Sequence, residues 1–592
     1  MNNNKFVFMP RLPRWRRCAL ALAIGACACA PAAQAVDFTW LGGTGNFNAS
    51  NWTSAGFPNA TTADVFIDGA RPGDSIVNLN IGASVGNLTI DAGDTFNVLE
   101  GRILTLGGNA LNNNGTLMLQ DTLNNSGRTG LLFNVDATLA GTGLTRIDSA
   151  GGLLDAFIDT SASSVRTLTI GTGQTVAGDG RIGGQFSTSF KVVNRGTVRA
   201  EGGTLQLTLS DANATPGLDN TGGVIAIAAG GQLRLGGGTV HGGSVQGSGG
   251  MLLGSGTGTL RDLSLTGSID VAEGNFIGIA GTLTNNGALT LLDTLNNGSR
   301  TGLQLNADAT LAGSGTTRID SAGNLLDAFI DSTGTTVRTL TIGAGHTVAG
   351  DGRIGGVLSS SLKLANRGTL RAEGTLRVTT TGADGFVNQG AVEIGGASTL
   401  TVVGVSLLQQ GAADAAIRLD GTLTASLVDL RDGTLGGTGI VAGSVLNAAH
   451  VGPGNSAGVL TVNGAYSQAA SGVLDIELAS LVQFDWLDVN GTATLAGMLA
   501  LHCLGTCELA VGDSLTILDA NPNNLLGEFS AVKLFGFATG KFDVVYDRAL
   551  GDVRLLVIEA TSAVPLPAAA WLMLGAIPML GMRRRVRGVG RG

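Results

Sequence analysis

Short triplets of the form apolar–polar–apolar recur along the chain and constrain its fold more than any other feature. Leu88–Thr89–Ile90 and Leu104–Thr105–Leu106 are two examples. Alternation with a period of two is typical of a β-strand that buries one face. Glycine and asparagine clusters such as Asn113–Asn114–Gly115 lie between triplets, and these residues tolerate the positive φ angles of tight corners. Further triplets begin at Leu168, Leu205, Leu233, Leu263, Leu289, Leu340, Leu400 and Leu460.

One segment of the chain occurs twice. Residues 115–202 return at 287–374 with an offset of 172 and no gap, and 63 of the 88 positions are identical. A repeat array tolerates such a duplication, because whole coils are inserted and the stacking between neighbours is unchanged.

The strand pattern and the duplication together predict an all-β, right-handed parallel β-solenoid. Coils of about 20 to 25 residues, stacked at about 4.8 Å, would give a rod on the order of 100 Å long. A row of β-sandwich domains is the alternative. It is less favoured because the chain lacks Pro-rich linkers: only 11 of its residues are proline, against 95 glycines.

The charge balance of the chain argues against nucleic-acid binding. The two ends hold ten of the 35 basic residues and no acid, which leaves about 25 basic and 44 acidic residues between them. Nucleic-acid binding needs clustered Lys and Arg that neutralise phosphates. An acidic body instead suits a surface protein that binds divalent cations weakly.

The N-terminus has the features of a secretory signal peptide. Basic residues from Lys5 to Arg17 precede an apolar run from Cys18 to about Cys29, which is too short to span a bilayer. Ala33 and Ala35 fit the small-residue rule for cleavage before Val36. A lipoprotein-type cleavage before Cys27 is the alternative.

The C-terminus has three parts in order. The proline motif is followed by the apolar stretch 568–582, which contains Pro578. Counted from Pro565, the stretch reaches about the lower limit for a membrane-spanning helix. A basic cluster then predicts that this end stays in the cytoplasm. On these grounds alone, a plain single-span anchor is the alternative. The motif is Val564, Pro565, Leu566 and Pro567, and the orienting cluster is Arg583, Arg584, Arg585 and Arg587.

This three-part tail resembles the PEP-CTERM sorting signal of Gram-negative bacteria that make exopolysaccharide. The resemblance implies recognition by an exosortase, a membrane-embedded cysteine transpeptidase that cuts its substrates near the proline motif. The chain itself would then stay in the inner membrane only transiently. Leu566 departs from the commonest form of the motif, which has Glu there. The match covers about thirty residues and concerns sorting alone.

Two further stretches resemble passenger segments of autotransporter-like proteins. The first is residues 38–43 with Asn51 and Trp52, which is similar to the opening cap of β-helical passengers. The second is residues 452–464 with 485–491, which is similar to their terminal segments. The resemblance implies an extracellular rod or an adhesin-like body.

Motifs that could carry catalysis are weak. Gly454–Gly458 has the letters of a nucleophile elbow around Ser456, but a strand-like run follows where a helix is required, and His502 is the only later histidine. Gly178–Gly183 fits a dinucleotide loop only in its letters. The best carboxylate and arginine candidates are Arg146, Asp148, Asp155, Asp159 and Arg166, with copies at Arg318, Asp320, Asp327, Asp331 and Arg338; ion pairs and turns are the favoured interpretation.

No cofactor or metal site is predicted, because the histidines His241, His346, His450 and His502 are scattered. Cys503 and Cys507 are the two cysteines left after removal of a signal peptide, and an oxidising compartment favours a disulfide between them.

We therefore expect a non-enzymatic, exported surface or matrix protein with a role in biofilm or adhesion and with exopolysaccharide as a possible partner. A carbohydrate-active β-helix enzyme and a receptor-specific adhesin are the alternatives. The expected organisation is a signal peptide at 1–35, an N-terminal β cap at 36–85, repeat copies at 86–257 and 258–445, a C-terminal β segment at 446–560 and the sorting signal at 564–592.

Overall fold

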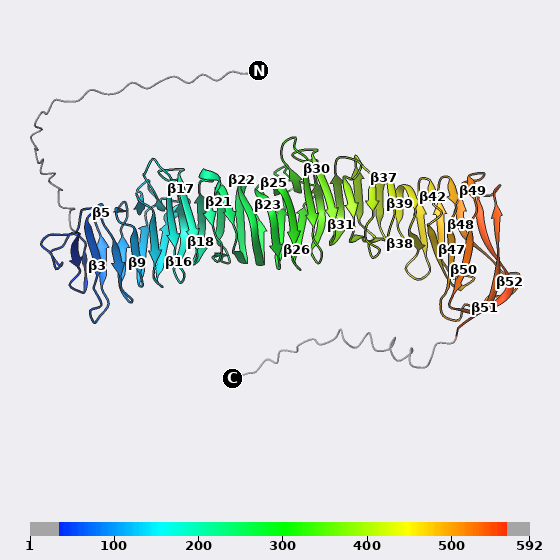
Figure 1. The fold of residues 1–592 in the computed structure, drawn as a ribbon, viewed down its shortest axis with the longest axis horizontal. Helices are drawn as coiled ribbons and strands as arrows, with labels where there is room; N and C mark the ends of the chain where they lie inside the picture. The colour runs from blue at the N-terminus through cyan, green and yellow to red at the C-terminus, as the bar shows by residue number, and fades with distance from the viewer. Residues whose placement is uncertain (1–34, 296, 324, 565–592) are drawn as a thin grey trace, which may run out of the picture.

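The computed structural model describes residues 35–295, 297–323 and 325–564, and these form a long parallel β-solenoid of about 19 turns (Figure 1). With the usual strand spacing of about 4.8 Å, this number of turns gives a rod of about 90 Å. The described residues hold two short helical segments, both 3₁₀ turns of three residues, at Ala150–Gly152 and Ala212–Ala214. The predicted all-β parallel solenoid is therefore confirmed.

Consecutive coils pair in parallel along each face of the rod. On one face β7 (Thr95–Val98) pairs with β10 (Thr116–Asp121), which pairs with β13 (Leu144–Ser149), which pairs with β16 (Thr175–Ile182).

The length of a coil is not constant. Near the C-terminal end Leu435 pairs with Val451 of the next coil, whereas in the first repeat copy Thr145 pairs with Val176, almost twice as far along the sequence. The predicted coil length lies between these two separations. Loops between the strands absorb the extra residues of the longer coils, so the stacking of the strands continues unchanged.

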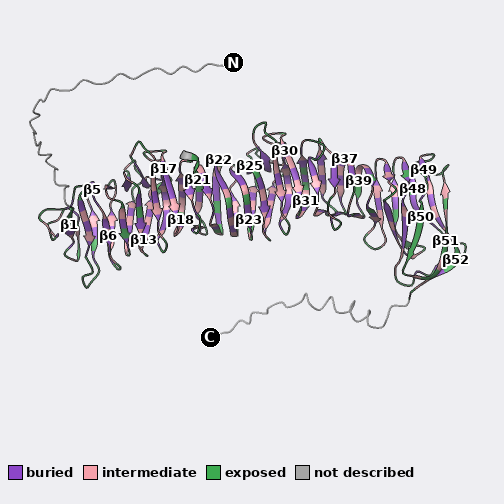
Figure 2. Cartoon of the chain, viewed as in Figure 1, coloured by how far each residue is buried: buried purple, intermediate pink, exposed green. Residues whose placement is uncertain are grey.

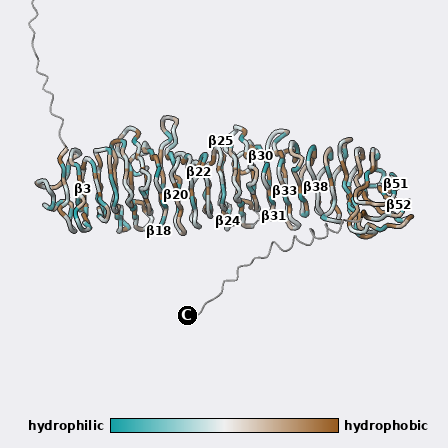
Figure 3. Tube along the Cα trace, turned by 60° about the horizontal axis from the view of Figure 1, so that its bottom comes forward, coloured by the Kyte–Doolittle hydropathy of each residue, from teal (hydrophilic) through white to brown (hydrophobic). Residues whose placement is uncertain are grey.

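The core is a continuous column that includes the apolar residues of the triplets. Buried residues recur in the strands along the whole rod (Figure 2). In β6 (Leu88–Ile90), for example, Leu88 and Ile90 are buried and Thr89 is half-buried. Hydrophobic and hydrophilic residues accordingly alternate along the coils (Figure 3). Every triplet predicted from the sequence lies in a strand and buries both of its apolar residues.

The duplicated segments fold alike. β16 (Thr175–Ile182) and its copy β29 (Thr347–Ile354) have the same length and the same burial pattern. Both break register at the same point, between Gly178 and Gly180 in the first copy and between Gly350 and Gly352 in the second. Each copy therefore builds the same bend into its coil.

An aromatic cluster closes the N-terminal end of the column. Trp52 forms edge-to-face contacts with Trp40 and Phe47, with ring centroids 5.0 and 5.3 Å apart. The Trp52 indole N–H donates to the Phe47 carbonyl at 2.9 Å, so its polar atom is satisfied although the side chain is only 4% exposed. The cluster rests on Phe96 of the coils beneath, with the centroids of Phe47 and Phe96 5.8 Å apart.

The C-terminal end departs from the parallel pattern. β52 (Asp552–Ala563) runs antiparallel both to β48 (Ser514–Ala520) and to β51 (Phe537–Asp547). β50 (Ala531–Phe535), on the last coil, pairs in parallel with β47 (Met498–Cys503), and every residue of β50 is exposed.

Most of the sorting residues lie outside the described part of the chain. These are Ala33 of the cleavage site, Pro565, Leu566 and Pro567 of the motif, and the four arginines of the cluster. Of the residues that are described, Val36 begins the first strand, β1 (Val36–Thr39), and the Val564 N–H donates to the Gly536 carbonyl at 2.9 Å. Among the described residues, no helix has the length and apolar character needed to cross a membrane. The domain boundaries stay predictions.

Candidate functional site

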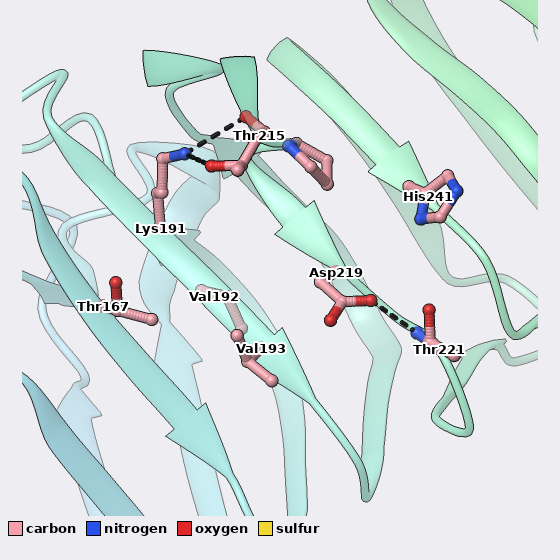
Figure 4. Close-up of a pocket in the computed structure, with 9 residues that line it drawn as sticks. Thr167, Lys191, Val192, Val193, Thr215, Asp219, Thr221 and His241 are labelled. Carbon is pink, nitrogen blue, oxygen red and sulfur yellow. Dashed lines mark hydrogen bonds between the residues drawn. The ribbon is translucent and has the colours of Figure 1, made fainter. Parts of the chain in front are cut away.

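One cavity of about 440 Å³ lies on the face formed by β15 (Arg166–Ile170), β17 (Phe190–Asn194), β19 (Leu218–Asp219) and β21 (Gln232–His241) (Figure 4). Residues of the segment between β18 (Thr197–Thr208) and β19 form one wall of it. The lining residues are Thr167, Lys191, Val192, Val193, Thr215, Pro216, Asp219, Thr221 and His241.

The charged groups of this cavity already have partners within the protein. The Lys191 ammonium donates to the carbonyl and the hydroxyl of Thr215 (Figure 4). It also donates to the Ala212 carbonyl. Burial lowers the pKa of Lys191. Burial raises the pKa of Asp219, but hydrogen bonds from Arg195, at 2.6 Å, and from Thr221 outweigh it and bring the pKa to about 2. Lys191 therefore fixes the segment between β18 and β19 that forms one wall of the cavity. The Asp219 carboxylate is already paired with Arg195.

A second cavity, of about 630 Å³, contains the elbow-like motif. Its lining includes Gly452–Ser456, Asp475, Glu477, Asp485 and His502. Ser456 and His502, which lie far apart in the sequence, thus share one cavity. His502 Nε2 lies 3.2 Å from Asp475 Oδ1, however, and strand β41 (Val459–Val462) follows the motif in place of a helix. The interpretation of this motif as a turn agrees with the structure.

Asp485 holds this turn. It is 1% exposed and accepts hydrogen bonds from the backbone N–H groups of Gly458, at 2.8 Å, and Glu477, at 3.0 Å. Burial raises its pKa to about 6 in spite of these donors. Ser456 and Ala457 have φ angles of 71° and 74°, a conformation that non-glycine residues adopt only when the surroundings impose it.

Two histidines that are scattered in the sequence meet at one carboxylate in the same region. Asp475 Oδ2 lies 2.8 Å from His450 Nδ1, and Asp475 Oδ1 contacts His502. The His502 ring stacks on Phe535 with centroids 4.8 Å apart. His450 and His502 each lie about one coil from Asp475 along the chain, on either side of it. The separations of 25 and 27 residues are each about one coil, but coil length varies along the rod, so the spacing in the sequence does not by itself identify this cluster.

The predicted aspartate and arginine candidates do not converge on one catalytic site. Asp159 is fully buried, and its carboxylate accepts backbone N–H bonds from Gln185, Phe186 and Ser187. Asp331, its copy, binds the matching loop residues Val357, Leu358 and Ser359. These two aspartates anchor loops.

Three of the four arginine candidates, Arg146, Arg318 and Arg338, make polar side-chain contacts within the protein. Arg146 forms an ion pair with Glu201 at 2.9 Å, and its copy Arg318 pairs with Glu373. Arg338 donates to the Leu305 carbonyl at 2.8 Å.

The glycines of the dinucleotide-like motif, Gly178 and Gly180, lie inside β16. Asp148 and Asp155 are instead among the acids that raise the pKa of Asp121. Asp121 is a buried carboxyl that was not among the candidates selected from the sequence.

His346, which replaces Gln174 of the first copy, is a core residue. It is fully buried, and its Nε2 lies 3.0 Å from the Thr317 hydroxyl. Burial lowers its pKa to about 4, so the ring is neutral at neutral pH. Within the described ranges, no group of three or more His, Cys, Asp or Glu residues is arranged to hold a metal ion.

The structure holds Cys503 and Cys507 as free thiols and does not show the predicted disulfide. Cys507 is fully buried and its thiol donates to the Leu478 carbonyl at 3.0 Å. Burial and the neighbouring Cys503 raise the pKa of the Cys507 thiol, so this thiol stays protonated at neutral pH.

The disulfide remains a prediction for the protein in an oxidising compartment. We expect that alkylation of the denatured, unreduced exported protein will label neither cysteine, because the two lie close together and have no other described cysteine to pair with. Peptide mass spectrometry is the measurement, with a reduced sample as the control. Labelling of both residues without reductant would show that they stay thiols.

The comparisons with known proteins do not assign this chain to a family. No protein-family model matches it, and no curated protein is similar to it in sequence.

Proposed function

We propose that this chain is an exported, non-enzymatic β-solenoid rod that serves as a structural or adhesive component of the cell surface or extracellular matrix. The observation that supports this most is the rod itself: the described residues form about 19 stacked coils, which present the duplicated segments along the length of the rod. Repeated faces on one rigid body favour multivalent contact, in which several weak sites act together.

The cavities support a structural role over a catalytic one. Neither of the two described above has a Phe, Tyr or Trp side chain in its lining, whereas sugar-binding clefts commonly use such rings as stacking platforms. In the first cavity Lys191 and Asp219 are engaged by the protein, and in the second Asp485 holds the turn. Exopolysaccharide, as the proposed partner, would then contact the outer faces of the rod.

The ends of the chain supply the proposed route. We propose that the signal peptide 1–35 directs export, and that an exosortase processes the tail at Val564–Pro567 after the arginine cluster has oriented it in the inner membrane. The coils are proposed to wind in a right-handed sense, as crossovers between parallel strands of one sheet nearly always do.

This proposal predicts that the protein from the native host ends near the proline motif and is found at the surface or in the matrix. Replacement of Arg583, Arg584, Arg585 and Arg587 with Ser should abolish processing and surface delivery, because the tail then loses the charges that resist translocation. Identification of the C-terminal peptide by mass spectrometry, together with cell fractionation, is the measurement.

A matched control replaces Arg418 and Arg431 with Ser, two exposed arginines of the rod that lie far from the tail in sequence. This variant should be processed normally. A mature protein that still ends at Gly592 and stays in the inner membrane would instead identify the tail as a plain anchor.

A further inference from the structure

A buried carboxyl without hydrogen-bond partners occurs at the same place in both copies of the duplication. Asp121 ends β10 (Thr116–Asp121) and is 1% exposed, and its copy Asp293 ends β24 (Ala288–Asp293) and is also 1% exposed. No described N–H or O–H group donates a well-formed hydrogen bond to either oxygen of either side chain. The polar groups that act on the two carboxyls are the glutamate opposite each of them and, at Asp293, the Asp327 backbone amide. Buried carboxylates are ordinarily paired or hydrogen-bonded, so these two need an explanation.

The coil before each aspartate places a second carboxyl against it. Val98 pairs with Leu119, and Glu100, two residues further on, lies close enough to Asp121 to act on its pKa. Val271 pairs with Leu291, and Glu273 acts on the pKa of Asp293 in the same way. Adjacent strands are about 4.8 Å apart, so each of these two corners of the solenoid stacks two acidic side chains directly on each other.

Each glutamate is held in a fixed position. Glu100 Oε2 accepts the backbone N–H groups of Thr122, at 2.7 Å, and Leu123, at 3.1 Å. Glu273 Oε2 accepts those of Thr294, at 2.7 Å, and Leu295, at 3.2 Å. In both copies the loop after the aspartate therefore closes over the glutamate, while Glu100 Oε1 is left without a partner.

The neighbours that act on the buried aspartates add further negative charge. Burial, then Glu100, Asp155 and Asp148 raise the pKa of Asp121 to about 7. Burial, then Glu273 and Asp327 raise the pKa of Asp293 to about 6, although the nearby Asp327 backbone amide acts to lower it. Like charges at this distance are unfavourable unless a proton or a cation lies between them.

The second copy keeps this arrangement although the glutamate lies outside the gapless duplication. The offset from Glu100 to Glu273 is one position longer than the offset from Asp121 to Asp293. Val98, Glu100 and Gly101 recur as Val271, Glu273 and Gly274, so the repeat extends upstream with one residue fewer between the glutamate and the aspartate of the second copy.

We propose that Glu100 with Asp121, and Glu273 with Asp293, form two equivalent sites, each of which binds one divalent cation with the chemistry of Ca²⁺. Carboxylates alone, with no nitrogen or sulfur ligand, suit a hard cation. Ca²⁺ takes about 6 to 8 oxygens in flexible geometry. The two carboxylates therefore supply part of the shell, and water molecules would supply the rest. The charge of the cation offsets the repulsion between the stacked acids.

Isothermal titration calorimetry with CaCl₂ on the purified full chain, after removal of divalent ions with a chelator, tests this proposal. We expect two sites per chain. Asp121→Asn should leave one site, Asp293→Asn should leave one, and the double variant should leave none of this class. Asparagine is compatible with a buried corner of this solenoid, because Asn366 and Asn388 already stack at such a corner through a 2.8 Å hydrogen bond.

Asp414→Asn, at an exposed carboxyl, is the matched control and should retain both sites. Ca²⁺ should also raise the thermal midpoint of the unsubstituted chain and leave that of the double variant unchanged, a readout that shows whether each variant is folded. The absence of calcium heat in the unsubstituted chain would overturn the proposal and show that each pair only shares a proton. Binding that persists in the double variant would also overturn it and show general attraction to an acidic surface.

Discussion

Replacement of Trp52 with alanine is expected to destabilise the N-terminal coils by about 3 to 5 kcal/mol, the usual cost of truncating a buried large aromatic residue. Trp52 is 4% exposed and contacts Trp40, Phe47 and Phe38. Its loss opens the end of the hydrophobic column to water, and in a solenoid each coil depends only on its neighbours. The damage should therefore be greatest near the end of the rod.

Hydrogen exchange followed by mass spectrometry is the suitable measurement, because it reports the stability of each coil separately. Amides of β1 (Val36–Thr39) and β3 (Ala63–Ile67) should exchange much faster in the Trp52→Ala variant. Trp486→Ala, at a tryptophan that is 39% exposed, is the control and should have a small effect. Equal protection of β1 and β3 in both variants would mean that the aromatic cluster does not hold the end closed.

Gly178→Ala is expected to disrupt the first repeat copy, with a loss of more than about 3 kcal/mol in local stability, at the upper end of single-substitution effects. The φ angle of Gly178 is 125°, and a Cβ atom there would lie 1.8 Å from the Ile147 carbonyl oxygen. The obstacle is the backbone of the neighbouring coil, so no side chain can move aside to relieve it.

Gly222→Ala separates this clash from the cost of the backbone angle. Gly222 also has a positive φ, 77°, but a Cβ there would meet nothing within 4 Å. Its substitution should cost only about 1 to 2 kcal/mol, the strain of a left-handed conformation. Amide exchange in β13 (Leu144–Ser149) and β16 (Thr175–Ile182) should distinguish the two variants. Similar exchange in both would show that the coils can separate to admit a methyl group.

The same experiment can be repeated in the second copy. Gly350 has a φ of 124°, and a Cβ there would lie 1.9 Å from the Ile319 carbonyl oxygen. Gly350→Ala should therefore reproduce the effect of Gly178→Ala one duplication further along the rod.

The sequence by itself determined the fold class, the buried positions and the equivalence of the duplicated coils. The reason is that strand alternation is local: Leu88 and Ile90 must face the same side of their strand, and a gapless copy of residues 115–202 must repeat whatever the first copy builds. The roles of Asp159 and Arg146 as a loop anchor and an ion-pair partner also followed the favoured interpretation of acids and arginines in turns and pairs.

Only the tertiary structure decided which polar residues meet. Coil length changes along a single face of the rod, so sequence separation does not give the register between distant side chains. His450, Asp475 and His502 therefore looked scattered, and Glu100 gave no sign that it stacks on Asp121. Which residues of neighbouring coils lie side by side depends on how each loop accommodates its extra residues. That in turn depends on how the loop packs against the coils on both sides, and the order of residues in the sequence does not show this packing.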